Sequence, residues 1–306
     1  MAPNVIIRPL NGLVPRKSFY KGLKVINEFV NPFIDDTLRL SPDELATKTK
    51  TEEGYTFLHA LASYTRDRNV LRDQLVAVLL AGRDTTASTL SWTFYELARH
   101  PEVFRKLREE IISKVGLVEA PTYQHLKDMK YLQVRPLLIT TQPPYLQLQN
   151  VMHETLRLYP VVPFNVRLAL KDTTLPVGGG PDGLSPMGIL KDTPIGYSTL
   201  IMQRRDDLTP DVMSFNPDRW FTWQPKPWQY IPFNGGPRIC IGQQFALTEM
   251  GYTIVRLLQN FDGLEGFMHE IDGGNPHLKA DIVLQPGQGV HVGFLERQSE
   301  TVKEKI

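Results

Sequence analysis

The chain contains a single cysteine, Cys240, placed where a glycine-rich stretch meets the start of a predicted helix in FNGGPRICIGQQFALTEM. At a helix N-terminus, unpaired N–H groups and the helix dipole favour a thiolate and can hydrogen-bond to sulfur. Gly235, Gly236 and Gly242 leave room for a large, flat group to approach the backbone. Because there is only one cysteine, an internal disulfide is excluded, which favours a reducing compartment.

The residues alone leave four roles open for this cysteine. Most lone cysteines are small buried side chains. A nucleophile needs a histidine base nearby in space, and none of the seven histidines lies in a recognisable nucleophile signature. A zinc site needs more cysteines or a close histidine cluster. An iron porphyrin needs one protein ligand, a flat slot and cations for its carboxylates.

The length of 306 residues allows one large domain or two ordinary ones, and the apolar periodicity predicts a mainly α-helical fold with a small β portion. The net charge of +1 argues against a nucleic-acid partner. The longest wholly apolar run, Leu75–Gly82, is too short for a membrane span, and no signal-peptide pattern follows Met1. Apolar spacing predicts helices over Tyr20–Leu40, Thr51–Asp67, Val70–His100, Pro101–Val115, Asn150–Pro160 and Ile241–Phe261. Short apolar runs between turn sequences predict strands over Val161–Met202 and Lys279–Leu295.

The segment FNGGPRICIG resembles the haem-binding loop of the cytochrome P-450 superfamily, phenylalanine-x-x-glycine-x-arginine-x-cysteine-x-glycine. All five fixed positions match, at Phe233, Gly236, Arg238, Cys240 and Gly242. The resemblance implies that Cys240 is the axial thiolate ligand of heme b iron, which makes it both the metal ligand and a cofactor-binding residue. It also implies that Phe233 packs beside the ligand and that Arg238 pairs with a haem propionate.

In HETLRLYP, Glu154 and Arg157 share one helix face, which taken alone predicts a surface ion pair of a few tenths of a kcal/mol. The superfamily has a glutamate-x-x-arginine pair here, joined by a later arginine in phenylalanine-x-proline-x-arginine. That arginine corresponds to Arg219 in FNPDRW. The resemblance therefore implies a buried structural triad of Glu154, Arg157 and Arg219.

The segment AGRDTTAS lies inside the helical pattern although glycine, aspartate and threonine are poor helix-interior residues. One interpretation is that the helix breaks here and Asp84 caps a second one. The resemblance implies instead a long helix across the haem face, with a small residue beside bound O₂. On this interpretation Ala81 and Gly82 supply the space, and Asp84 and Thr85 deliver protons.

Arg167, which follows YPVVPFNV, has two interpretations. It is either a solvent-exposed strand arginine or, by resemblance, a second partner of a haem propionate.

The wider sequence looks most like fungal fatty-acid and alkane hydroxylases. It covers only the C-terminal part of the P-450 fold, so we expect a single, N-terminally truncated domain over residues 1–306. The resemblance implies monooxygenation of a hydrophobic substrate with O₂ and electrons from an NADPH-dependent reductase. It also implies an endoplasmic-reticulum membrane location, although this chain carries no anchor. Rival hypotheses are an inactive fragment or haem-binding remnant and, in a different class, a cysteine-nucleophile enzyme.

The segment Val134–Gln149 has no counterpart in the superfamily, and its prolines forbid a continuous helix. Valine codons begin with GT and a glutamine codon can end with AG, so one hypothesis is a short intron translated in frame. The other is a surface loop, which chains tolerate well.

Overall fold

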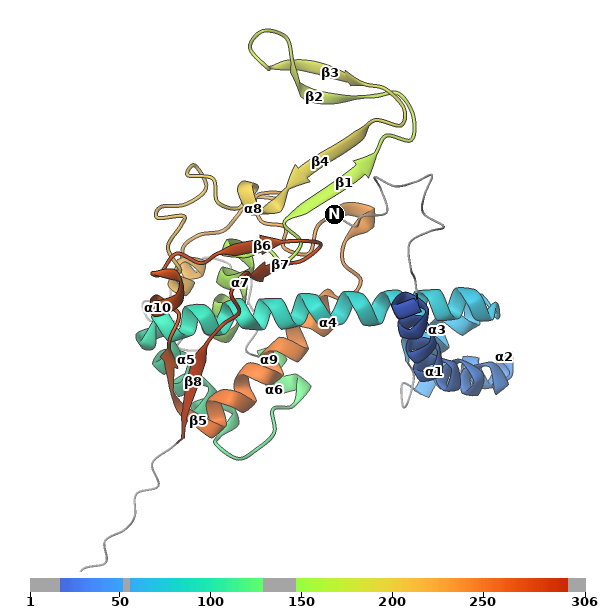
Figure 1. The fold of residues 1–306 in the computed structure, drawn as a ribbon, viewed down its shortest axis with the longest axis horizontal. Coiled ribbons are helices and arrows are strands. Elements are labelled where there is room, and N and C mark those ends of the chain that lie inside the picture. The colour runs from blue at the N-terminus through green and yellow to red at the C-terminus, as the bar shows by residue number, and fades with distance from the viewer. Residues whose placement is uncertain (1–16, 52–55, 129–146, 297–306) are drawn as a thin grey trace, which may run out of the picture. The chain divides into compact units, whose positions relative to one another are not determined.

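The computed structural model describes residues 17–51, 56–128 and 147–296. It divides the chain into two compact units, Met1–Asp84 and Thr85–Ile306. We refer to them as unit 1 and unit 2 and describe each by itself; Figure 1 labels their helices and strands.

Unit 1 is helical. It contains α1 (Lys17–Arg39), α2 (Pro42–Thr51), α3 (Phe57–Tyr64) and the first half of α4 (Arg68–Arg99). Thr56 caps α3 because its hydroxyl accepts from the His59 N–H while the His59 ring accepts from the Thr56 N–H. The core is small and aliphatic, made by Val30, Ile34, Leu45, Leu58, Ala62 and Leu71.

The helix α4 is continuous through AGRDTTAS, so the predicted alternative of a break with Asp84 as a cap is wrong. A Cβ added at Gly82 would meet nothing within 4 Å, so packing does not require glycine there. Hydroxyl side chains follow this segment and bond back along the helix, as Thr89 Oγ1 does to the Thr85 carbonyl (2.9 Å).

Unit 2 packs helices around an aromatic and aliphatic core. Its helices are the second half of α4, α5 (Pro101–Val115), α6 (Tyr123–Asp128), α7 (Gln147–Leu158), α8 (Thr199–Met202), α9 (Gln243–Asn260) and α10 (His269–Asp272). Two 3₁₀ turns, η3 (Pro217–Phe221) and η4 (Gly236–Arg238), lie in the connection before α9. Fully buried side chains from α4, α5, α7 and α9 form the centre, among them Trp92, Leu107, Val151 and Ile254.

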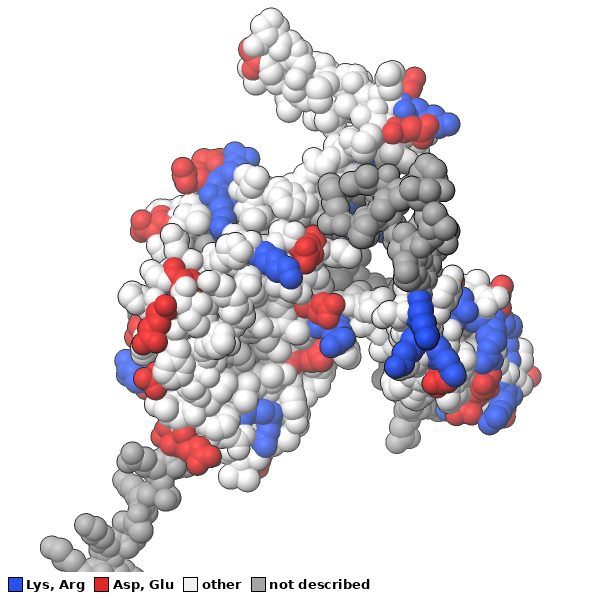
Figure 2. Space-filling view, in the orientation of Figure 1, with Lys and Arg blue, Asp and Glu red and all other residues white. Residues whose placement is uncertain are grey.

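The strands of unit 2 form four two-stranded antiparallel ribbons. β1 (Phe164–Leu168) pairs with β4 (Pro194–Ser198), and β2 (Thr173–Gly179) pairs with β3 (Ser185–Ile189). β5 (Phe261–Gly266) pairs with β8 (Val292–Glu296), and β6 (Leu278–Ala280) pairs with β7 (Leu284–Pro286). Figure 2 shows acidic and basic side chains mixed on the visible face of unit 2. Within the described ranges, no helix combines the length and the apolar character that crossing a membrane demands.

The start of α7 bears on the predicted insertion, most of which lies outside the described residues. α7 begins at Gln147, so the last three residues of Val134–Gln149 form its first turn. Leu148 is fully buried and its N–H donates to Glu110 Oε2 (3.1 Å). If Val134–Gln149 is removed, Leu132 and Gln133 take the places of Leu148 and Gln149, and both residue types are unchanged.

We therefore predict that the chain without Val134–Gln149 keeps its fold and gains about 1–2 kcal/mol of unfolding free energy, because the shorter connection loses less entropy. The measurement is urea unfolding followed by tryptophan fluorescence, since all four tryptophans, at 92, 220, 223 and 228, lie in unit 2. The control is an equal-length glycine–serine replacement of Val134–Leu146, which keeps the first turn of α7 and should match the parent. Loss of cooperative unfolding in the deletion variant would contradict the prediction.

Candidate functional site

The loop that carries Cys240 is held by backbone hydrogen bonds. The Cys240 N–H donates to the Phe233 carbonyl (2.9 Å), and the Ile239 N–H donates to the Gly236 carbonyl (3.1 Å). Cys240 and Arg238 are both exposed, and α9 begins three residues after the cysteine with Gly242 as its N-cap. Cys240 thus lies just before the N-terminus of α9, where no side chain caps the helix.

Large apolar side chains are exposed around this sulfur. Ile239 is 53% exposed, Ile241 87% and Phe245 67%. Three such side chains on one loop and the first helical turn after it form a larger apolar surface than a scattered single residue would. An exposed thiol, an exposed guanidinium and apolar side chains therefore gather on this loop.

The three glycines beside Cys240 are there for different reasons. A Cβ at Gly235 would lie 2.6 Å from the Trp228 ring, so this position is small because the indole occupies the space. The expectation that Gly235 leaves room for a ligand is therefore wrong. Gly236 has φ +69°, which favours glycine. At Gly242 an added Cβ would meet the Cys240 sulfur at 3.9 Å, an ordinary contact.

The structure brings Glu154, Arg157 and Arg219 together in the interior of unit 2. Arg157 donates from Nε and Nη2 to the two carboxylate oxygens of Glu154 (2.9 Å each). Arg219 Nε donates to Glu154 Oε1 (2.8 Å). Glu154 and Arg157 are fully buried and Arg219 is 6% exposed. The arrangement is a buried bidentate pair with a second arginine on the same carboxylate.

Two further donors complete this site, and sequence reasoning did not single them out. The Asn216 N–H donates to Glu154 Oε1 (2.9 Å) and Trp220 Nε1 donates to Oε2 (3.0 Å). Both residues lie in the FNPDRW segment, and their closeness in sequence to Arg219 was the signal that could have identified them. The remaining guanidinium N–H groups donate to the Thr209 hydroxyl and to the backbone carbonyls of Gln203, Pro210, Asp211, Val212 and Ser214. The buried charges are hydrogen-bonded to one another and to the polar groups around them, and the structural role of the triad stays a prediction.

The predicted oxygen-side residues lie in the middle of α4. Asp84 ends unit 1 and its exposed carboxylate lies 3.8 Å from Arg83 Nε. Thr85 begins unit 2. Next to it Thr86, to which the sequence analysis assigned no functional role, has a buried hydroxyl without a hydrogen-bond partner among the described residues. The position of Thr86 directly after Asp84–Thr85 was the only signal for it.

Arg167 lies on β1 and is half-buried. Its Nη1 donates to the Val166 carbonyl (3.0 Å), and its guanidinium lies 5.5 Å from the centroid of the Tyr197 ring on β4. The simple interpretation of a freely solvated strand arginine therefore misses its packing on an aromatic ring.

A buried carboxylate that the sequence analysis missed lies between α4 and the end of α7. Glu96 is 3% exposed and accepts from Tyr159 Oη (2.5 Å). Burial raises the pKa of Glu96, against the opposing effect of the Tyr159 hydrogen bond and of Arg99. The Tyr159 ring stacks on Trp92 with 4.1 Å between centroids.

We predict that Tyr159→Phe lowers the unfolding free energy by about 1–3 kcal/mol, and more at high pH than at low pH. In the parent protein, the Tyr159 hydroxyl stabilises the ionised form of the Glu96 carboxylate. Removing the hydroxyl therefore raises the folded-state pKa of Glu96 further. Because this pKa lies above that of the unfolded chain, the folded state loses stability as the pH rises through it. The check is urea unfolding between pH 5 and pH 9. In the Glu96→Gln background the same substitution should cost less and show little pH dependence. A pH-independent loss in the parent would contradict the prediction.

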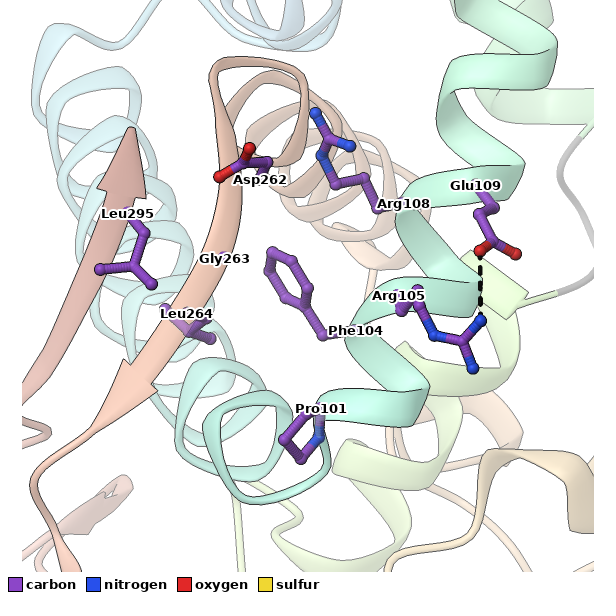
Figure 3. A pocket seen from close by; sticks show the side chains of 9 residues that line it. All are labelled: Pro101, Phe104, Arg105, Arg108, Glu109, Asp262, Gly263, Leu264 and Leu295. Atoms are coloured by element: carbon purple, nitrogen blue, oxygen red, sulfur yellow. Dashed lines mark hydrogen bonds and ion pairs between the residues drawn. The ribbon is translucent and has the colours of Figure 1, made fainter. Parts of the chain in front are cut away.

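A pocket of about 330 Å³ lies between α5, β5 and β8 in unit 2. Figure 3 shows that Phe104, Leu264 and Leu295 form its apolar wall, with the Arg105–Glu109 ion pair (3.5 Å) beside them. No residue predicted from the sequence to bind a cofactor lines this pocket, so it adds nothing to the Cys240 site.

Comparison with known proteins decides the family. The family model described as Cytochrome P450 matches residues 7–135 and 141–285. The chain belongs to the cytochrome P450 family. It is 52% identical over 296 residues to the cytochrome P450 monooxygenase pvhE of Talaromyces variabilis, covering 94% of this chain and 52% of that protein. It is 44% identical to cytochrome P450 52A13 of Debaryomyces hansenii, covering 92% and 52%.

The chain spans about half the length of the curated P450 relatives it matches. The P450 family match leaves out residues 136–140, which lie inside Val134–Gln149. The insertion itself and the single-domain organisation over residues 1–306 stay predictions.

The residues around Cys240 fit the haem that the P450 family implies. The sulfur is exposed rather than buried, so it is available as a ligand. Ile239, Ile241 and Phe245 offer apolar surface to a planar macrocycle, and Arg238 offers a cation to its carboxylates.

Proposed function

We propose that the protein is a haem-thiolate monooxygenase that inserts one oxygen atom of O₂ into a C–H bond of a hydrophobic substrate, the other atom leaving as water. The single observation that carries this proposal is the exposed Cys240 in a complete P450 haem-loop motif at the start of α9. The P450 relatives, which include a protein named as a monooxygenase, support the proposal.

In this proposal each residue of the loop has a physical role. Cys240 supplies a thiolate to iron, and the uncapped N–H groups at the start of α9 stabilise the charge on sulfur. Arg238 and Arg167 hold the two haem propionates through charge-assisted hydrogen bonds. Haem with such a ligand supplies O₂ activation, because the thiolate donates electron density to iron.

The oxygen side of the proposal rests on α4. Asp84 and Thr85 would hold and supply the protons that oxygen activation by a bound haem requires. Gly82 keeps this stretch of the helix free of a side chain. The helix penalty of about 1 kcal/mol for a glycine relative to alanine is consistent with a functional demand.

The substrate and the partners are proposed from the resemblance that the sequence shows. We propose a fatty acid or an alkane as substrate, because the sequence looks most like fungal hydroxylases of these compounds, and an NADPH-dependent reductase as the electron donor. We also propose location at the endoplasmic-reticulum membrane, as the resemblance implies.

A second candidate is a haem-binding remnant or inactive fragment. The observation that favours it is the large exposed apolar surface at Ile241 and Phe245 in a chain about half as long as its relatives. The two candidates differ in turnover rather than in haem binding.

The test is the reduced carbon-monoxide difference spectrum of the chain expressed with a haem supply. We expect the red-shifted Soret band of thiolate-ligated iron, lost in Cys240→Ala and kept in Thr248→Ala, an exposed hydroxyl on α9. A band typical of non-thiolate iron, or the absence of haem, would refute the haem-thiolate proposal. If haem binds, oxygen incorporation from isotopically labelled O₂ into a fatty acid, with a reductase present, separates the enzyme from the remnant. Alkylation of Cys240 that abolishes an activity in haem-free protein would instead indicate a cysteine-nucleophile enzyme.

A further inference from the structure

We propose that Asn165, Tyr197 and Asn234 form a polar bridge that fixes the Cys240 loop to the β1–β4 ribbon and so sets the spacing between Cys240 and Arg167. We refer to these three residues as the asparagine bridge. The inference rests on the proposed haem site and assigns positioning residues to it. None of the three occupies a fixed position of the motif that identifies the loop, since Asn234 is at one of its variable positions.

The amide of Asn234 is held from both sides. Its Oδ1 accepts from Tyr197 Oη (2.8 Å), and its Nδ2 donates to Asn165 Oδ1 (3.1 Å). Its Oδ1 also accepts from the Gly235 N–H (3.1 Å). Asn165 and Tyr197 face each other across the β1–β4 ladder, so one cross-strand pair supplies both external partners. The side chain can satisfy these contacts in only one orientation of its amide.

The backbone of Asn234 joins the bridge to the cysteine. Asn234 has φ +65°, a left-handed conformation that asparagine tolerates better than most residues. Its N–H donates to the Ile231 carbonyl (2.9 Å). The residue before it, Phe233, provides the carbonyl that accepts the Cys240 N–H (2.9 Å). A displacement of Asn234 therefore moves the peptide group to which the cysteine is hydrogen-bonded.

The other end of the bridge leads to Arg167. Arg167 lies two residues after Asn165, so both side chains are on the same face of β1. Its guanidinium packs on the ring of Tyr197, whose hydroxyl belongs to the bridge. The bridge thus lies between the thiol and the arginine that the proposed function assigns to iron and to a propionate.

The test uses haem-free protein, so its outcome does not depend on haem binding. The variants are Tyr197→Phe, which keeps the ring under Arg167, and Asn234→Gly, which keeps the positive φ. The control is Tyr252→Phe, an exposed tyrosine on α9. NMR hydrogen exchange at the Cys240 amide should accelerate about fivefold or more in both variants, because one neutral hydrogen bond corresponds to about that factor in a local opening equilibrium. Exchange at Ile254 in the core of α9 should not change.

A second readout uses the sole thiol. The rate of Cys240 alkylation by iodoacetamide at one fixed pH should change in Tyr197→Phe and Asn234→Gly and should equal the parent rate in Tyr252→Phe. Unchanged exchange and alkylation in both bridge variants would overturn the inference. If either variant fails to fold, Asn165→Ala, which removes the other partner of Asn234, takes its place with the same expected result.

Failure of the bridge and failure of the haem proposal give different results. If the carbon-monoxide spectrum shows no thiolate-ligated haem but the bridge variants loosen the Cys240 amide, the bridge stands and the haem proposal falls. If haem binds and the bridge variants leave both readouts unchanged, the haem proposal stands and the bridge falls. In haem-loaded protein, the bridge also predicts faster haem transfer to apomyoglobin from Tyr197→Phe than from Tyr252→Phe.

Discussion

Glu154→Ala should lower the free energy of unfolding of unit 2 by about 3–5 kcal/mol, because it strands two buried guanidinium groups without their carboxylate. Five donors converge on this carboxylate, including both arginines and the Trp220 indole. The surrounding carbonyls cannot neutralise the charges of Arg157 and Arg219, which are 0% and 6% exposed. Urea unfolding monitored by tryptophan fluorescence measures the loss, and Trp220 itself lies in the site.

The matched control is Asp207→Ala, which breaks the pair with Arg205 (2.7 Å) at the surface, where both side chains are more than half exposed. It should cost no more than about 1 kcal/mol. Glu154→Gln should fall between the two variants, because an amide still accepts hydrogen bonds but leaves the charges unpaired. A loss for Glu154→Ala as small as that of the surface control would show that the triad does not stabilise the fold.

The second large effect is expected in acid. Unit 2 should lose about 2–3 kcal/mol of unfolding free energy as pH falls from about 6.5 towards 4, through the protonation of His153. Burial lowers the pKa of His153 to about 4. The ring packs against Trp220 and Tyr230, and its Nδ1 lies 2.8 Å from Tyr230 Oη. Because the folded-state pKa is depressed, the unfolded chain binds the proton first and stability falls with pH over this interval.

In His153→Phe, the unfolding free energy should change little between pH 6.5 and pH 4, while an aromatic ring stays beside Trp220. The control is His269→Gln, because His269 is exposed at α10. Its unfolding free energy should fall with pH as steeply as that of the parent. Unfolding free energies from urea titrations at half-unit pH steps give both slopes. If the unfolding free energy of His153→Phe falls as steeply as that of the parent, the loss in acid comes from groups other than His153.

The helices could largely be predicted from the sequence because the apolar spacing and the residues that begin or end helices agree. Pro101 begins α5 as expected of a first helical residue, and α4 spans nearly the predicted Val70–His100. The expectation of a break at Asp84 arose because local propensity disfavours Gly82 and Asp84 in a helix. A helix of 32 residues carries them, since a few unfavourable residues are offset by the continuous hydrogen bonding on either side. The strand pairing of β8 with β5 could not be read from spacing, because it joins segments on both sides of α10.

For the candidate site, the motif predicted the residues proposed to carry the chemistry but not those proposed to position them. Asn234 and Tyr197 lie 37 residues apart, and no periodicity links a loop residue to a particular strand neighbour. Gly235 illustrates the converse. A glycine beside a cysteine suggests space for a ligand, whereas the structure fills that space with Trp228. The difference between an empty and an occupied space is tertiary, and a single sequence does not contain it.

The carbonyl of Leu284 has a consequence for biosynthesis. It accepts both from Ser88 Oγ (2.5 Å) and from Trp92 Nε1 (3.2 Å), across 196 and 192 residues of chain. At a translation rate of about 5–20 residues per second, the indole of Trp92 leaves the ribosome roughly 10–40 s before its partner is made. During that time the apolar side of α4 must stay unpacked or be covered by a chaperone. The order of synthesis therefore leaves this side of α4 without its Leu284 partner, and open to aggregation, until β7 has been made.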